Sequence, residues 1–265
     1  MAVRLDLRLV ELGLAPSRAR AQAMIKEGVV FVNGKPAAKA GVPCGEEDEI
    51  RVTGEICPYV SRGGLKLEKA LSSFCVDPHG LVCTDSGAST GGFTDCMLQL
   101  GAKKVFAIDV GTDQLVDKIR NDPRVVVMEQ TNIRYVTPEQ LGEPVDLSVV
   151  DVSFISLRLV LPAIYDLLKE GGQVVCLIKP QFEAGKEHLN KKGVVKDPKV
   201  HRTVLEDFTA FTSDIGFSLR NMTFSPVTGP EGNIEFLAHL CKSPEKGILP
   251  DVQRLVLDAH MTLKG

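Results

Sequence analysis

Five short apolar runs, each followed by a polar or charged residue, constrain the fold of this chain more than any other feature. They are LVCTD (81–85), KVFAID (104–109), VVVM (125–128), DLSVVD (146–151) and QVVCLIK (173–179). Their apolar residues are consecutive rather than alternating, which is typical of parallel strands that are buried on both faces. Helical patterns separate the runs. This alternation predicts an α/β fold with a doubly wound, mostly parallel sheet.

The ends of these strands are the first place to look for a functional site, because ligands of doubly wound sheets bind beyond the carboxyl ends of the strands. The first run leads into DSGASTGGFT (85–94), whose glycines permit a tight turn and close approach of the backbone to a ligand. The second run ends in Asp109. An acid at this spacing commonly accepts the ribose hydroxyls of a nucleoside cofactor.

Two nucleoside cofactors compete for this glycine-rich loop. A dinucleotide site would require G-x-G-x-x-G, but Ser89 occupies the place of the second glycine. Asp85, at the entry of the loop, disfavours a pyrophosphate and suits the cationic amino-acid end of S-adenosylmethionine. The charge therefore favours S-adenosylmethionine over NAD, and a purely structural glycine turn is the remaining alternative.

Four charged residues stand in apolar surroundings. Lys179 and Asp151 close two of the strands, Glu235 lies in the apolar pattern GNIEFLAHL, and Lys66 lies on an amphipathic helix. Each alone has an ordinary structural explanation, because lysines snorkel and carboxylates cap helices. Together in one cleft, they would suit deprotonation of a ribose 2′-hydroxyl by a neutral amine. Burial of Lys179 and a second cation, Lys66, would both favour the neutral form of the base.

The first sixty residues read as a small α+β module. Leu5, Leu9 and Leu12 predict a helix, a second apolar helix follows, and VVFV (29–32) leads into the hairpin signal Asn33-Gly34. Residues 1–40 hold seven Lys and Arg against three acids, although the whole chain has a net charge of −3. Such a basic zone attracts phosphates, although a solvated helix face would look the same.

The ordered string R-L-D…L…G-L-A-x-S-R…A…I…G…V-x-V-N-G-K, over residues 4–52, resembles the RNA-binding module first known from ribosomal protein S-four. This resemblance implies that RNA is contacted by Arg4, Arg18, Arg20 and Lys35.

The larger part of the chain resembles the TlyA family through YVSRGGLKL, DSGASTGGFTD, DVSFISL, LIKPQFEAGK, KGVVKD and GPEGNIEF. Members of this family are rRNA 2′-O-methyltransferases, also labelled hemolysin A, with an FtsJ-like, Rossmann-like catalytic domain. The resemblance implies methylation of cytidine ribose in large-subunit, and for some members small-subunit, rRNA. It also implies that the family's Lys-Asp-Lys-Glu tetrad falls on Lys66, Asp151, Lys179 and Glu235.

The same resemblance implies the cofactor contacts and the domain organisation. S-adenosylmethionine is expected to contact Asp85, Gly87, Ala88, Ser89, Thr90, Gly91, Gly92, Phe93, Asp109, Val110, Asn132 and Asp151. We expect an RNA-binding domain over 1–52, a linker, TGEICP, over 53–58, and a methyltransferase domain over 59–265.

Residues 180–202 form a second basic zone and are predicted to be a long loop that closes over RNA at the active site. Lys191 and Lys192 in this loop, and Arg62, are the further expected RNA contacts. His188 and His201 have no evident partner in the sequence, which predicts surface positions for both.

Cysteine spacing and hydropathy bear on the environment of the protein. The seven cysteines are scattered and never spaced C-x-x-C, which predicts reduced, mostly buried thiols and no metal site. No apolar run approaches the ~18 residues that span a bilayer, and no secretory signal is evident, so a cytoplasmic location is expected.

Three alternatives to a methyltransferase remain open at this stage. The chain could be an RNA-binding ribosome-assembly factor whose enzymatic fold is silent, a membrane-active hemolysin, or an NAD-dependent dehydrogenase. The complete four-residue set argues against the first, the absence of a membrane-active segment against the second, and the Asp85 loop against the third.

Overall fold

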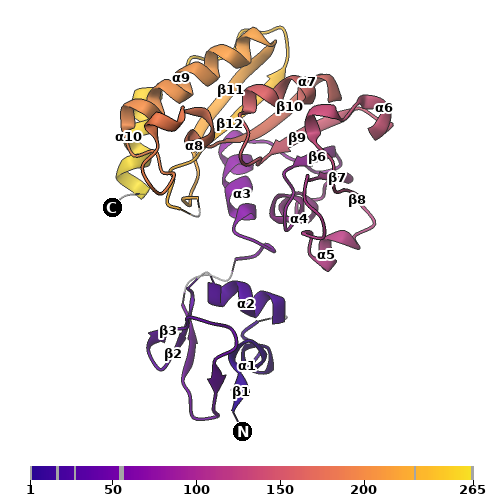
Figure 1. Ribbon diagram of the computed structural model, residues 1–265. Coiled ribbons are helices and arrows are strands. Elements are labelled where there is room, and N and C mark those ends of the chain that lie inside the picture. The colour runs from indigo at the N-terminus through magenta and orange to yellow at the C-terminus, as the bar shows by residue number, and fades with distance from the viewer. Residues whose placement is uncertain (1, 16–17, 27, 54–56, 230, 264–265) are drawn as a thin grey trace. The chain divides into compact units, whose positions relative to one another are not determined.

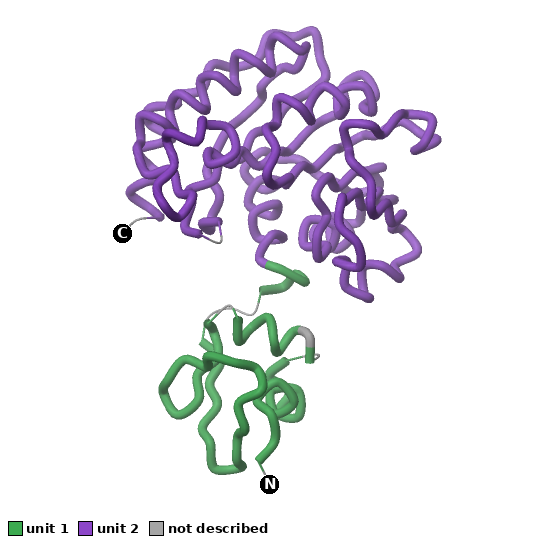
Figure 2. Tube along the Cα trace, in the orientation of Figure 1, with its two compact units in different colours: residues 1–61 green, residues 62–265 purple. Residues whose placement is uncertain are grey.

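The computed structural model describes residues 2–15, 18–26, 28–53, 57–229 and 231–263. The chain divides into two compact units, residues 1–61 and 62–265 (Figure 2). The predicted linker, 53–58, falls within the span of the first unit, and its residues 54–56 lie outside the described part of the chain.

The first unit packs two helices, α1 (Leu5–Glu11) and α2 (Arg18–Lys26), with short strands. The strands are β1 (Val3–Arg4), β2 (Val30–Val32), β3 (Lys35–Pro36), β4 (Pro43–Cys44) and β5 (Ile50–Val52). The predicted hairpin is confirmed, because β2 and β3 pair antiparallel and both Asn33 and Gly34 have positive φ. The helix predicted from Leu5, Leu9 and Leu12 is confirmed as α1, in which Leu5 and Leu9 are buried and Leu12 is the C-cap residue.

The second unit is built on a seven-stranded sheet, in the order β11-β12-β10-β9-β6-β7-β8 (Figure 1). The five predicted strands are confirmed as a parallel set: β6 (Val82–Ser86), β7 (Lys104–Ile108), β8 (Val125–Met128), β9 (Val145–Val150) and β10 (Leu168–Ile178). Two further strands, β11 (Phe217–Phe224) and β12 (Phe236–Lys242), extend the sheet beyond β10. Strand β12 runs antiparallel to both of its neighbours.

Helices cover both faces of this sheet. They are α3 (Gly63–Phe74), α4 (Gly92–Gln99), α5 (Asp117–Arg120), α6 (Pro138–Leu141), α7 (Leu161–Leu167), α8 (Pro180–Glu183), α9 (Pro198–Asp214) and α10 (Val252–Leu263), with single 3-10 turns η1 (Ile133–Tyr135), η2 (Leu157–Leu159) and η3 (Lys186–His188). Helices α7, α9 and α10 share the main core with Phe236 and Ala238 of β12. Helix α3 covers the opposite face, where its Phe74 stacks on His239 of β12. Within the described residues, none of the helices is long and apolar enough to cross a membrane.

Residues alternate between the two faces along β12, and this alternation positions the candidate site. Phe236 and Ala238 point to the main core, so Glu235 and His239 belong to the α3 face. Side chains alternate in the same way along β10, so Ile178 points into the main core and Lys179, the next residue, points to the α3 face.

Two predictions in the 180–202 segment were wrong. The predicted long loop is partly helical, because residues 180–183 form α8, residues 186–188 form η3 and residues 198–202 begin α9. At the start of α9 the Asp197 side chain accepts the backbone N–H of Lys199 at 2.8 Å and Pro198 occupies the first helical position. His201 is fully buried, and its Nδ1 lies 2.8 Å from Nε2 of His260 on α10. His188 is exposed, as predicted.

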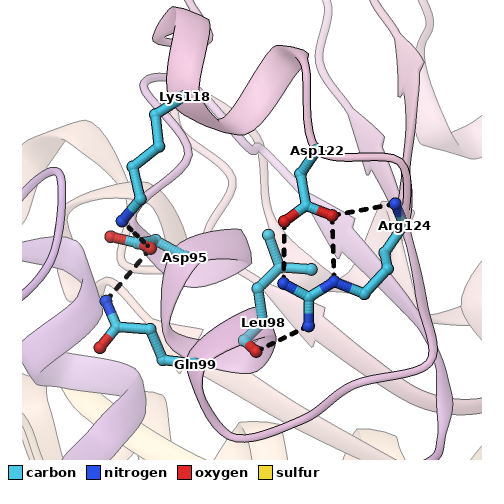
Figure 3. A network of polar contacts seen from close by, with 6 residues as sticks. All are labelled: Asp95, Leu98, Gln99, Lys118, Asp122 and Arg124. Atoms are coloured by element: carbon cyan, nitrogen blue, oxygen red, sulfur yellow. Dashed lines mark hydrogen bonds and ion pairs between the residues drawn. The ribbon is translucent and has the colours of Figure 1, made fainter.

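A polar network fixes helix α4, which begins where the glycine-rich loop ends (Figure 3). The buried Asp95 carboxylate accepts Nζ of Lys118 at 3.0 Å, which ties α5 to α4. Arg124 donates to the Asp122 carboxylate and, at 3.0 Å, to the carbonyl of Leu98 at the end of α4. Helix α4, into which the loop leads, is therefore hydrogen-bonded both to α5 and to the segment just before β8.

Candidate active site

A pocket of 450 Å³ opens at the carboxyl ends of β6, β7 and β9, which is the edge of the sheet where the sequence placed a site. Six of the expected cofactor residues line it: Gly87, Ser89, Asp109, Val110, Asn132 and Asp151. The other expected residues of the loop do not line this pocket. Ala88, Gly91, Gly92 and Phe93 are buried and shape the turn into α4, and Thr90 is exposed.

Gly87 brings the loop into close contact with the end of β9. Its φ is +88°, and a β-carbon at this position would lie 2.5 Å from the backbone oxygen of Asp151. A side chain here would both strain the backbone and push Asp151 away. Glycine is therefore required for the loop and the end of β9 to form one wall of the pocket.

Asp109 follows β7 directly, lines the pocket and accepts two backbone hydrogen bonds. Its Oδ2 accepts the backbone N–H of Ser89 at 2.8 Å, and its Oδ1 accepts that of Gly111 at 2.7 Å. A carboxylate offers about four lone-pair sites, so both oxygens can accept further hydrogen bonds. The neighbouring Val110 is 70% exposed and offers an apolar surface at the rim.

Asp85 lies beneath the loop rather than on the pocket wall, and it is fully buried. Its Oδ2 accepts the hydroxyl of Thr94 at 2.6 Å, and its Oδ1 has no hydrogen-bond partner among the described residues. Burial raises the pKa of Asp85 to about 7, and the negative charges of Asp151 and Asp109 contribute to this rise. A nearby cation would favour the charged form of this carboxylate.

The four charged residues singled out by the sequence form two ion pairs. Nζ of Lys66, on α3, lies 2.5 Å from Oε2 of Glu235, whose side chain is 1% exposed. Nζ of Lys179 lies 2.6 Å from Oδ1 of Asp151, and these side chains are 10% and 20% exposed. Each amine is thus held by a carboxylate in a nearly buried position.

Strand register brings the two pairs together. The last ladder pair between β10 and β12 is Ile178 opposite Phe236, so Lys179 and Glu235 stand opposite each other one position further on. Opposite residues of antiparallel strands project to the same face, with Cβ atoms about 5 Å apart. The four charges therefore gather at one end of the sheet, on the α3 face. Gly229 also approaches this group, since a β-carbon there would lie 2.6 Å from Oε1 of Glu235.

Ser153 and Phe154 belong to this site although the sequence analysis did not single them out. Both line the 450 Å³ pocket, and the Ser153 Oγ accepts Nζ of Lys179 at 2.8 Å. Phe154 is 91% exposed, its φ is +64°, and its ring lies 5.2 Å from that of Phe182. A bulky residue in this backbone conformation costs about 1 kcal/mol and is uncommon. Their sequence signals were the motif DVSFISL (151–157), which indicated the family but no role for either residue, and their position directly after the strand that ends at Asp151.

Two of the four expected RNA contacts in the first unit, Arg4 and Arg18, are arranged around the buried Asp6. Arg4 and Arg18 donate to the two carboxylate oxygens of Asp6, at 3.0 and 2.9 Å, while their side chains stay about half exposed. The hydrogen bond from Arg4 holds the pKa of Asp6 well below its usual value, although burial opposes the shift. Lys35 is exposed on β3, and Arg20 donates to the carbonyl of Cys57 at 3.4 Å.

The remaining expected RNA contacts lie in the second unit. Arg62 is exposed at the start of α3. Lys191 and Lys192 line a separate hollow of 440 Å³ together with Lys196 and Glu231.

The turn that carries these lysines is hydrogen-bonded to the segment before Glu235. The Asn233 side chain accepts the backbone N–H of Val195 at 3.0 Å and donates to the carbonyl of Gly193 at 3.1 Å. The basic hollow is therefore attached to the strand segment that supplies one of the four charges.

Comparison with known proteins identifies the family of the chain. Residues 59–242 match the family model described as FtsJ-like methyltransferase, and residues 3–50 match the S4 domain. The chain therefore belongs to the FtsJ-like methyltransferase family and carries an S4 domain at its N-terminus.

Individual relatives cover almost the whole chain. It is 49% identical over 98% of its length to YqxC of Bacillus subtilis (strain 168), whose name carries the words rRNA methyltransferase and of which 95% is covered. It is 42% identical to the 16S/23S rRNA (cytidine-2'-O)-methyltransferase TlyA of Mycobacterium tuberculosis, over 92% of each chain. A solved structure from Streptococcus thermophilus, whose name carries the word hemolysin, matches 99% of this chain and 97% of its own, with 47% identity and a TM-score of 0.80.

The raised pKa of Asp85 predicts a pH-dependent stability. Between the ordinary value of 3.8 and about 7, the folded protein keeps a proton that the unfolded chain has released, so this residue destabilises the fold as pH rises through that window. Asp85→Asn removes the effect. By urea unfolding without ligand, we expect this variant to exceed the parent by about 1–3 kcal/mol at pH 8 and to show no gain at pH 4. A difference that does not vary with pH would contradict the assignment.

The close approach at Gly87 predicts a specific loss of ligand binding. Gly87→Ala should lower the affinity for S-adenosylmethionine about 5- to 150-fold, because displacing Asp151 costs on the order of 1–3 kcal/mol. Gly142→Ala is the matched control, because Gly142 has a φ of +74° and a β-carbon there would meet no described atom within 4 Å. Isothermal titration calorimetry would compare the two. Equal affinities in both variants would show that the contact with Asp151 does not matter.

Proposed function

We propose that this protein methylates the 2′-hydroxyl of cytidine ribose in ribosomal RNA, with S-adenosylmethionine as methyl donor. The observation that carries the proposal is the gathering of Lys66, Glu235, Lys179 and Asp151 beside the 450 Å³ pocket. Family membership supports the methyltransferase class. The TlyA relatives, whose names specify rRNA cytidine 2′-O-methylation, support the substrate. Such a substrate implies a cytoplasmic location, where ribosomes are found.

The pocket has the chemistry that S-adenosylmethionine requires. Asp109 offers lone pairs to ribose hydroxyls, and Val110 offers an apolar surface to the adenine ring. Asn132 lines the same pocket. Gly87 leaves room for the ligand at the turn, and the acids Asp85 and Asp151 complement its positive charge. The donor supplies an electrophilic methyl group on a positively charged sulfur, and the bonding electron pair leaves with the sulfur as a neutral thioether.

Lys179 is the base of the proposed reaction. As the ribose oxygen bonds to the methyl carbon, its proton passes to Nζ of Lys179, which becomes an ammonium ion. The Asp151 carboxylate stabilises that ammonium ion. Glu235 holds Lys66 in place at 2.5 Å.

The exposed aromatic side chain of Phe154 fits the nucleotide that carries the target ribose. Its ring stands on the rim of the pocket, paired with Phe182, whose ring centroid lies 5.9 Å from Nζ of Lys179. Aromatic side chains bind unstacked bases by stacking, which is a common mode of single-stranded RNA recognition. Phe154 is therefore placed to hold the base while the ribose meets Lys179.

RNA is proposed to contact two basic surfaces, one in each unit. The S4 domain presents the half-exposed Arg4 and Arg18 on their buried partner Asp6. The methyltransferase domain presents the lysine hollow, whose backbone is hydrogen-bonded to Asn233 two residues before Glu235. Phosphates bound in this hollow would position the RNA strand relative to the catalytic charges.

Substitution of Lys179 by arginine tests its role as base. Lys179→Arg keeps the positive charge beside Asp151, but a guanidinium does not release its proton in proteins. We expect at least a hundredfold loss of tritiated methyl transfer to ribosomal subunits, since general bases contribute ~10²–10⁴-fold. Lys103→Arg, exposed at the other end of β7, should retain full activity. Near-normal transfer by Lys179→Arg would remove Lys179 as the base.

Charge reversal tests the basic hollow. The pair Lys191→Glu and Lys192→Glu should weaken binding of ribosomal RNA and reduce its salt dependence, because two phosphate contacts are lost. The control pair Lys103→Glu and Lys246→Glu changes the net charge by the same amount. Lys103 precedes β7 and Lys246 follows β12, so both lie beyond the end of the sheet that is opposite the candidate site. Binding is measured by filter retention at several salt concentrations, and cofactor affinity should stay unchanged in all variants. Equal RNA affinity of the two pairs would contradict the proposed contact.

A further inference from the structure

Ser153 contacts the amine of Lys179 and has no role in the reaction described so far. Its Oγ lies 2.8 Å from Nζ, next to the carboxylate oxygen of Asp151 at 2.6 Å. It follows β9 by three residues and lines the 450 Å³ pocket. The unusual φ of Phe154, the next residue, turns the chain sharply at this point.

The number of hydrogens on the Lys179 amine decides whether it has a lone pair that can accept a proton. An ammonium ion has three N–H groups, whereas a neutral amine has two N–H groups and one lone pair. Ser153 accepts a hydrogen bond from Nζ, and the Asp151 carboxylate lies 2.6 Å from Nζ as an ion-pair partner. When Lys179 is neutral, the hydrogen bond to Ser153 fixes the direction of one N–H group and keeps the lone pair turned away from that hydroxyl.

The identity of the second acceptor also matters. A second carboxylate at this distance would favour the ammonium form and leave less of Lys179 in the neutral form that can accept a proton. A hydroxyl oxygen accepts a hydrogen bond without adding a negative charge. Serine therefore restricts the orientation of the amine and interferes less with the neutral form.

We propose that Ser153 is a positioning residue for methyl transfer: its hydroxyl holds one N–H group of neutral Lys179 beside the Asp151 carboxylate, so that the lone pair faces the ribose 2′-hydroxyl. This inference rests on the proposed function. The proton leaves the ribose oxygen for Nζ, which then carries three N–H groups, one of them still donated to Ser153.

The test compares Ser153→Ala with Ser153→Thr, which keeps the hydroxyl. Single-turnover methyl transfer to ribosomal subunits is measured at saturating S-adenosylmethionine, from neutral pH up to the pH at which the rate stops rising. We expect Ser153→Ala to lower the plateau rate about tenfold or more, because a small misplacement of a reacting group is costly. Ser153→Thr should stay within about threefold of the parent. A substitution that changed only the proton affinity of the base would shift the pH–rate profile along the pH axis and leave the plateau rate unchanged.

Three results would overturn the assignment. One is a parental plateau in Ser153→Ala, and another is an equal loss in Ser153→Thr, which would make space rather than the hydroxyl the cause. The third is a lower affinity of Ser153→Ala for S-adenosylmethionine, measured by calorimetry, that accounts for the whole loss of rate. Failure of the proposed function looks different, because the parent protein itself would then transfer no methyl group to ribose.

Discussion

The site depends on the placement of two amines and two carboxylates at one end of the sheet, each amine within ion-pair distance of a carboxylate. Burying such charges costs several kcal/mol per ion unless partners and hydrogen bonds compensate, and removal of one partner leaves the other uncompensated. Lys66 with Glu235, and Lys179 with Asp151, meet this condition at 2.5 and 2.6 Å. The surrounding elements, α3, the end of β9 and the β10–β12 pair, are what keep the four groups in register.

Asp151 links the 450 Å³ pocket to the four charges. Its backbone oxygen packs against Gly87 of the loop, and its backbone N–H donates to the carbonyl of Ser86 at 2.9 Å. Its side chain pairs with Lys179. A ligand that moved the loop would therefore move the acid that pairs with Lys179, the proposed base.

Much of this arrangement could be predicted from local sequence signals. The parallel strands were evident because burial on both faces leaves consecutive apolar residues, and the charges that close them marked the functional edge. The pairing of particular amines with particular acids could not be predicted, because it depends on the register of β10 against the antiparallel β12. His201 was misplaced for a similar reason, since its partner His260 lies on another helix. Asp197-Pro198 is a helix start with a clear local signal, whereas the loop interpretation followed the density of basic residues. Ser153 lies in the motif DVSFISL, which indicated the family but not a role for the serine, because its contact with Lys179 exists only once β9 and β10 lie side by side.

The most direct test of the central claim is nucleoside mass spectrometry of ribosomal RNA after incubation with this protein and S-adenosylmethionine. If the four charges act together on a ribose hydroxyl, the digest will contain new 2′-O-methylcytidine, and Glu235→Gln, which weakens the hold on Lys66, will reduce it strongly. Methylation found on a base, or equal 2′-O-methylcytidine from the parent and the variant, would contradict the account.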